Sequence, residues 1–222
     1  LYLDVVEAFA TCKEIPAERK PLIIGGRYGL SSKDTTPAQM LAVFENLKAG
    51  EPKNQFTVGI VDDVTNRSLP VGEEISMAKP GTLEALFFGL GADGTVGANK
   101  NSIKIIGGTT DKYCQAYFSY DSKKSGGYTS SHLRFGDLPI TSPYLVTTPD
   151  FVACHVPSYV DKYDVLKGLK AGGSFLLNSV HDAATTCRTL PDHMKVYLAK
   201  NKINFYIINA TKIAAELGLG SR

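Results

Sequence analysis

Residues 89–100 read GLGADGTVGANK and follow LEALFF at residues 83–88, an apolar run typical of a buried strand. Gly89, Gly91 and Gly94 form a G-x-G-x-x-G motif between that strand and an expected helix, which is where such a loop acts. Glycines let the backbone approach a ligand, and the free N–H groups of a helix start favour an anion. The stretch therefore predicts a phosphate-binding loop, although a tight turn without a ligand is the other interpretation. The residues expected to take part are Gly89, Gly91, Ala92, Asp93, Gly94, Thr95, Asn99 and Lys100.

Downstream of the loop, apolar runs with strand character alternate with helical patterns. Strands that alternate with helices in this way form parallel βαβ units. The sequence therefore predicts an α/β fold with a doubly wound, mostly parallel sheet. The expected strands are Tyr113–Tyr120, Phe151–His155, Ser174–Leu177 and Ile203–Ile208, with short strands at His132–Phe135 and Tyr144–Thr147 in a polar excursion. The expected helices run from the glycine loop to Gly107-Gly108, from Ser158 through Val160, Tyr163, Leu166 and Leu169, over Pro191–Ala199, and onward from about Thr211.

The first 79 residues have a different pattern and predict a smaller α/β piece. Thr36-Pro37-Ala38-Gln39 is a capping box with proline at the first helical position, and the helix that it begins is expected to end at Gly50. A short amphipathic segment is expected at Leu3–Phe9, and strands at Pro21–Gly25 and Phe56–Val61. Pro80-Gly81 closes a polar stretch and marks a seam. We expect one domain over residues 1–79 and a second over residues 80–222, in a piece of a longer protein, since the first residue is not Met.

Polar residues follow several of the expected strands. Ligands of an open parallel sheet gather at the carboxyl ends of its strands, so Ser122, Lys123, Lys124, His155 and Asn178 are expected to share an edge with the glycine loop. A dinucleotide fingerprint needs an acidic residue about 20 positions after the glycines. Asp121 comes later and two lysines follow it, which suits an additional phosphate better than a ribose diol; a solvated basic turn is the alternative.

Other kinds of site have weaker support. The histidines have no metal-ligand spacing, and no G-x-x-x-x-G-K-[ST] motif is present. We expect His155 to be a partly buried strand-end residue rather than a base, and His132 and Arg134 either to orient an anion or to pair within the excursion. No nucleophile–base pair is evident, so the sequence predicts a binding module without catalytic or metal-binding residues.

Composition excludes several classes of partner. The net charge of +2, with 43% hydrophobic and 21% charged residues, predicts neither a nucleic-acid nor a membrane partner. No apolar run approaches the roughly 18 residues that span a bilayer, and the first ten residues do not resemble a signal peptide. The four cysteines are scattered, which argues against zinc and iron–sulfur sites and fits core residues of a cytoplasmic or organellar protein.

Several longer motifs resemble one enzyme family. GLGADGTVGANK at residues 89–100, YFSYDSKKSGG at residues 117–127 and SHLRFG at residues 131–136 are similar to the pyruvate:ferredoxin (flavodoxin) oxidoreductases. So are IIGGRYGLSSK at residues 23–33, FTVGIVDDVT at residues 56–65, DFVACHVPSYV at residues 150–160 and the final GLGSR. The resemblance implies oxidative decarboxylation of pyruvate to acetyl-CoA and CO₂ with thiamine diphosphate, Mg and [4Fe-4S] clusters, and electron transfer to ferredoxin or flavodoxin.

The resemblance also implies a role for each part of the chain. Residues 1–79 look like the end of the family's second domain, and residues 80–222 like most of its third, gamma-type domain, to which coenzyme A binding is attributed. Phosphates of coenzyme A are then expected near Gly91–Thr95 and near Lys123 and Lys124, with Asn99, Lys100, Ser122 and Asn178 as lesser candidates.

The thiamine and cluster sites are expected outside the segment, which by itself would be inactive. A homo-oligomer is also expected, in the cytoplasm or in an anaerobic energy organelle. A stand-alone NADP-dependent oxidoreductase and a purely structural domain are the alternatives.

Overall fold

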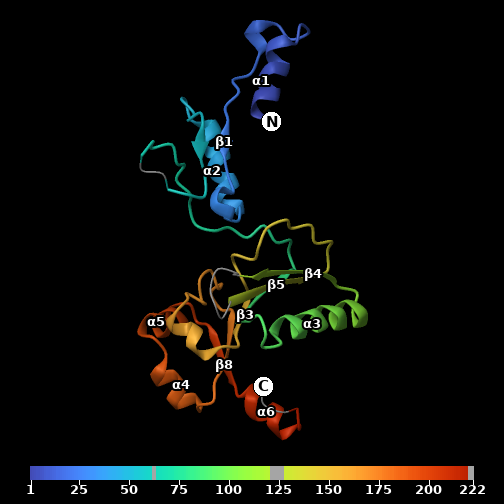
Figure 1. Ribbon diagram of the computed structural model, residues 1–222, viewed down its shortest axis with the longest axis vertical. Coiled ribbons are helices and arrows are strands. Elements are labelled where there is room, and N and C mark those ends of the chain that lie inside the picture. The colour runs from blue at the N-terminus through green and yellow to red at the C-terminus, as the bar shows by residue number, and fades with distance from the viewer. Residues whose placement is uncertain (62–63, 121–127, 220–222) are drawn as a thin grey trace. The chain divides into compact units, whose positions relative to one another are not determined.

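A computed structural model describes residues 1–61, 64–120 and 128–219. The chain forms two compact units, Leu1–Ile75 and Ser76–Arg222 (Figure 1, blue to cyan and green to red). This division falls after residue 75, whereas the sequence places a seam after residue 79. Within the described ranges, no helix has the length and apolar character needed to cross a membrane.

The first unit is small and is built around one helix. α1 (Tyr2–Thr11) precedes β1 (Gly26–Arg27), α2 (Pro37–Lys48) and β2 (Phe56–Thr57), and β1 pairs with β2 in parallel. The capping box is half formed: the Thr36 hydroxyl accepts a hydrogen bond from the Gln39 amide at 3.4 Å, but Gln39 Oε1 has no partner. α2 ends at Lys48, two residues before Gly50. β2 is shorter than expected, and no strand forms over Pro21–Gly25, because β1 covers the two residues that follow.

A single six-stranded sheet organises the second unit. Its strand order is β4-β5-β3-β6-β7-β8. β3, β6, β7 and β8 are parallel neighbours, and β5 is antiparallel to both β3 and β4. The predicted α/β fold with a mostly parallel sheet is therefore confirmed. The strand bounds are Leu83–Leu90 for β3, Tyr113–Tyr120 for β4, Tyr128–Gly136 for β5, Phe151–Cys154 for β6, Ser174–Asn178 for β7 and Asn204–Ile208 for β8.

The order of the strands places a switch point between β3 and β6. From β3 the chain passes through α3 (Thr95–Thr109) to β4 and β5 on one side, and then returns to β6, β7 and β8 on the other. In Figure 1, α3 lies to one side of the strands, whereas α4 (Ala183–Thr189) and α5 (Asp192–Lys200) lie to the other. Ligands of open α/β sheets bind at the carboxyl edge beside such a switch point, and this is the edge that carries the glycine loop.

Two expectations about individual elements are wrong. The polar excursion contains one long strand, β5, and residues 144–147 form no strand. The helix expected from Ser158 is only a 3₁₀ helix, Pro157–Asp161, followed by turns. α3 ends at Thr109, one residue after the expected Gly107-Gly108, and α4 is an additional helix that was not expected. The last helix, α6 (Ala210–Glu216), begins close to the expected residue.

The second unit has an apolar core and a buried ion pair. Val152, Phe175 and Leu177 lie in the core beside Leu86 and Phe88 of β3. At the opposite end of β3 from the glycine loop, Arg134 Nε donates to Glu84 Oε1 at 2.8 Å, and both side chains are almost fully buried. The guanidinium also donates to Gln115 and to the Tyr144 carbonyl. These bonds fasten β5 to β3, β4 and the segment that follows β5.

Candidate functional site

The glycine loop joins the end of β3 to the start of α3. A Cβ on Gly89 would lie 2.3 Å from Thr95 Oγ1, so only glycine lets the Thr95 side chain pack against this strand. Gly94 is the N-cap of α3 and has a φ of +87°, a left-handed conformation that glycine adopts without strain. Two glycines of the motif thus have a structural reason: Gly89 allows the close approach of Thr95, and Gly94 adopts a left-handed backbone conformation.

The carboxylate of Asp93 is bound within the loop. Its Oδ2 accepts a hydrogen bond from the Leu90 amide at 2.8 Å, and its Oδ1 accepts one from the Thr95 amide at 2.8 Å. Two amides that could hold an anion are therefore bound to a carboxylate of the chain itself. A phosphate that binds here must accept hydrogen bonds from amides that are not bonded to the Asp93 carboxylate, including those of Gly91 and Ala92.

The start of α3 offers both donors and room. The first bond of its helical ladder runs from the Ala98 amide to the Gly94 carbonyl, so the amides of Val96 and Gly97 precede the ladder. A Cβ on Gly94 or Gly97 would meet no atom within 4 Å, which leaves open space above this turn. The helix dipole adds positive potential at the same position. Geometry and electrostatics here suit a phosphate.

A hydrogen bond spans the switch point beside the loop. The Thr95 hydroxyl and His155 Nδ1 are 2.7 Å apart, and either group can donate according to the imidazole tautomer. The His155 amide donates to the Phe88 carbonyl at 2.9 Å. Burial lowers the pKa of His155, an effect that the nearby Asp93 carboxylate partly opposes. The imidazole is therefore predominantly neutral at pH 7, and the expectation of a partly buried strand-end residue is confirmed.

The other candidate residues lie in several environments. Asn99 is buried, and its Nδ2 has no partner. Lys100 places its ammonium 5.4 Å from the centre of the Phe118 ring on β4. Both ends of the Asn178 amide are bonded, because Nδ2 donates to the His155 carbonyl and Oδ1 accepts from the Ala210 amide, each at 3.1 Å.

Ser122, Lys123 and Lys124 lie outside the described residues. The strands on either side of these three residues are described. Tyr120 at the end of β4 pairs with Thr129 of β5, and Thr129 also pairs with Gly89. The chain therefore leaves β4 and enters β5 at the edge that carries the glycine loop. The Thr129 hydroxyl also donates to the Gly89 carbonyl at 3.0 Å, a contact that no sequence signal indicated.

His132 and Arg134 are interior residues and do not reach this edge. The Val146 amide donates to His132 Nδ1, and Ser130 is bonded to Nε2. Burial first, and then the Arg134 charge, lowers the pKa of His132 to about 4. Arg134 pairs with Glu84 rather than with His132 or an anion.

The cysteines differ from one another in environment. Cys154 is buried as expected, and burial raises the pKa of its thiol to about 12, so it stays protonated. Cys187 is exposed on α4, which corrects the expectation that all four lie in the core. Among the described residues, no three His, Cys, Asp or Glu side chains gather closely enough to hold a metal ion.

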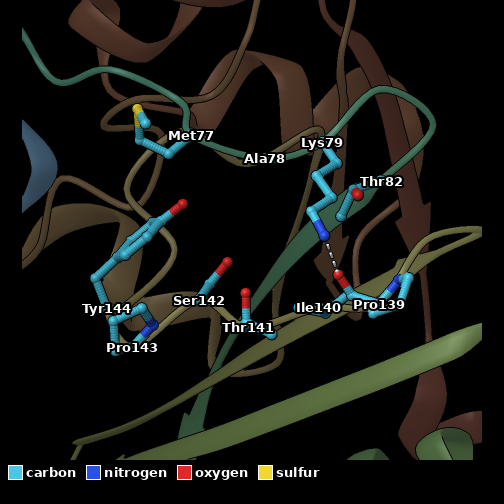
Figure 2. Close-up of a pocket in the computed structure, with 10 residues that line it drawn as sticks. All are labelled: Met77, Ala78, Lys79, Thr82, Pro139, Ile140, Thr141, Ser142, Pro143 and Tyr144. Carbon is cyan, nitrogen blue, oxygen red and sulfur yellow. Dashed lines mark hydrogen bonds between the residues drawn. The ribbon is translucent and has the colours of Figure 1, made fainter.

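A small cavity of about 140 Å³ lies elsewhere in the second unit, between residues 77–82 and residues 139–144. Figure 2 shows Lys79 donating to the Pro139 carbonyl, at 2.8 Å, on one side of this cavity. Thr82 immediately precedes β3, so the cavity lies at the end of that strand away from the glycine loop. The chemistry of the candidate site therefore belongs to an open edge rather than to this cavity.

Comparison with known proteins identifies the family. A family model described as pyruvate ferredoxin/flavodoxin oxidoreductase matches residues 84–222. This chain belongs to that family. It is 59% identical over 201 residues to the pyruvate:ferredoxin oxidoreductase of Moorella thermoacetica, covering 90% of this chain and 17% of that protein. It is 55% identical to the pyruvate-flavodoxin oxidoreductase of Enterobacter agglomerans, covering all of this chain and 19% of that protein.

A solved structure resembles part of this chain more distantly. It is the pyruvate oxidoreductase subunit PORC of Thermotoga maritima, with a TM-score of 0.47 and 21% identity over 61% of this chain and 66% of that one. The chain spans less than a fifth of the length of the two curated relatives of this oxidoreductase family.

Proposed function

We propose that this chain is the coenzyme A-binding segment of an enzyme that oxidatively decarboxylates pyruvate to acetyl-CoA and CO₂ and reduces ferredoxin or flavodoxin. Identities of 55–59% to oxidoreductases named for pyruvate support the reaction. The glycine loop supports the role of the segment, because its free amides and open space lie at the carboxyl edge beside the switch point. The loop geometry is the observation that carries the assignment.

Coenzyme A has a pyrophosphate and a 3′-phosphate, and this edge can supply two kinds of partner for them. We place one anionic group at the amides near Gly91–Thr95. Lys123 and Lys124, between β4 and β5, supply cations to another. Hydrogen bonds to charged groups contribute about 1.5–3 kcal/mol each, so loss of both lysines should weaken binding well over tenfold.

The parent enzyme's other cofactors do not fit the described residues. With no cluster of three possible ligands and with scattered cysteines, this part of the chain has no site for an iron–sulfur cluster or for the Mg of thiamine diphosphate. The segment's own residues bind and orient the coenzyme. We also place the parent enzyme, a homo-oligomer, in the cytoplasm or an anaerobic energy organelle.

The test is calorimetric titration of the chain with coenzyme A. Wild type should bind one equivalent, and Lys123→Ala/Lys124→Ala should bind more than tenfold more weakly. Lys112→Ala is the matched control, since Lys112 pairs with Asp137 at the other end of β4 and should not affect binding. Equal affinity of wild type and the double variant would contradict the assignment of the lysines, and no binding to wild type would contradict the proposed function.

A further inference from the structure

A row of hydrogen bonds crosses the carboxyl edge of the sheet in the second unit. Thr95 on α3 is bonded to the ring of His155, the His155 carbonyl accepts from Asn178, and Asn178 accepts from Ala210 at the start of α6. These residues come from four separate elements or their ends, and each of the three bonds uses at least one side chain. The candidate phosphate loop is thus the first member of a continuous row.

His155 is held from several directions. Its amide is bonded to Phe88, its carbonyl accepts from Asn178, and its ring meets the Phe87 ring edge-on at 6.2 Å between centroids. These contacts leave the imidazole a defined orientation. Its Nδ1 is then presented to the Thr95 hydroxyl, at 2.7 Å.

Thr95 transmits this constraint to the loop. It is the first residue of α3 and only 3% exposed, its amide is bonded to Asp93, and its side chain packs on Gly89. The amides of Val96 and Gly97 follow it directly. Any rotation of the first turn about Thr95 would change where these two donors point.

We propose that His155 is a positioning residue for the phosphate loop: through the Thr95 hydroxyl it holds the first turn of α3 in the orientation that binds an anion. The inference rests on the proposed function, because the anion is a phosphate of coenzyme A. It goes beyond that function in assigning the loop's geometry to a residue that does not itself touch the ligand. Asn178 belongs to the same row as a support of His155.

Paired variants separate this hydrogen bond from packing. Thr95→Val keeps the shape of the side chain and removes the hydroxyl, whereas Thr95→Ser keeps the hydroxyl. His155→Leu removes the ring nitrogen, whereas His155→Asn places an amide atom near the position of Nδ1. His193→Asn, at an exposed position on α5, is the matched control for loss of an imidazole.

The expected result is a non-additive loss of coenzyme A affinity. By calorimetry, Thr95→Val and His155→Leu should each weaken binding about two- to tenfold, which is the range expected for one hydrogen bond. The double variant should bind no more weakly than either single one. Thr95→Ser, His155→Asn and His193→Asn should stay within about twofold of wild type. Wild-type affinity in both disruptive variants, or full additivity in the double variant, would overturn the inference.

Amide hydrogen exchange gives a readout that does not depend on the ligand. In Thr95→Val and His155→Leu the Ala98 amide, which is bonded to the Gly94 carbonyl in the first turn of α3, should exchange faster than in wild type, while the amides of α5 keep their rates. If wild type binds no coenzyme A, the proposed function fails, and exchange still decides whether His155 orders this turn. Unchanged exchange at Ala98 would overturn the positioning role even where coenzyme A binds.

Discussion

Replacing Gly89 with alanine tests the packing on which the glycine loop depends. The added Cβ would lie 2.3 Å from Thr95 Oγ1, 2.8 Å from Thr95 Cβ and 2.9 Å from Asp93 Oδ2. All three distances are shorter than atoms of this kind tolerate, so the Thr95 side chain must move away from β3. That movement also breaks or lengthens the bond between Thr95 and His155.

The magnitude follows from three contributions. Overpacking at a closely packed position costs about 1–3 kcal/mol, and loss of a hydrogen bond costs about 0.5–1.5 kcal/mol more. Alanine in place of glycine within a strand returns about 0.5–1 kcal/mol through backbone entropy. The net expectation for Gly89→Ala is a loss of about 0.5–4 kcal/mol in the free energy of unfolding.

Urea unfolding monitored by circular dichroism measures this change. Gly108→Ala is the matched control, because Gly108 is exposed on α3 and its Cβ would meet no atom within 4 Å. That substitution should raise the free energy of unfolding by about 0.5–1 kcal/mol through helix propensity. An unchanged or higher urea midpoint for Gly89→Ala would refute the close packing of Thr95 against β3.

Three further predictions concern the stability of the second unit. Gly168 and Gly172 share a φ of +76°, but a Cβ on Gly168 would lie 2.0 Å from a backbone oxygen and one on Gly172 would meet no atom within 4 Å. In thermal denaturation, Gly172→Ala should cost about 1–2 kcal/mol and Gly168→Ala several kcal/mol more; equal losses would contradict the stated packing. Arg134→Met should cost about 3–5 kcal/mol in urea unfolding because it leaves Glu84 buried without its main partner, and adding Glu84→Leu should recover part of that loss. A double variant less stable than Arg134→Met would count against this interpretation. Because the pKa of His132 is lowered from 6.5 to about 4, the unfolded chain binds more protons between those pH values, and stability should fall as pH drops from 6.5 to 4. Urea titrations across this range should show a shallower fall for His132→Gln, and identical pH slopes would rule out this linkage.

The strands of the second unit could be predicted well because their residues leave few alternatives. Leu83–Phe88 and Ser174–Leu177 are apolar runs bounded by glycine or polar residues, and both form central strands. Local composition cannot give the direction of a strand. β5 contains Ser130, Ser131 and His132, a polar composition that predicts a loop rather than an interior strand. It nevertheless lies between β3 and β4, where Arg134 of β5 forms an ion pair with Glu84 of β3.

Helix boundaries show a similar limit. Val160, Tyr163, Leu166 and Leu169 have helical spacing, but residues 157–161 form a 3₁₀ helix and the chain then turns. Their side chains still reach the core, since Tyr163 stacks on Tyr128 at 4.8 Å. The glycine pair Gly107-Gly108 predicted the end of α3 closely, because that helix ends at Thr109. Apolar spacing indicates burial here, but it does not determine the type of helix.

The position of the candidate site could be predicted from the sequence more fully than the hydrogen bonds within it. The rule of carboxyl strand ends placed the glycine loop, His155 and Asn178 on one edge. It could not reveal that the Asn178 side-chain amide is hydrogen-bonded to His155 and Ala210. Nor could it reveal that the Asp93 carboxylate accepts hydrogen bonds from two loop amides, because both arrangements depend on backbone angles within turns. The central claim that remains is that the loop's other amides receive a phosphate of coenzyme A.

Amide chemical shifts test that claim most directly. In ¹⁵N-labelled protein titrated with coenzyme A, we expect saturable changes in the amide chemical shifts of Gly91, Ala92, Val96 and Gly97. Residues 77–79 beside the distant cavity should not respond. Shifts confined to other regions, or none at all up to millimolar coenzyme A, would contradict the assignment of the glycine loop as a phosphate site.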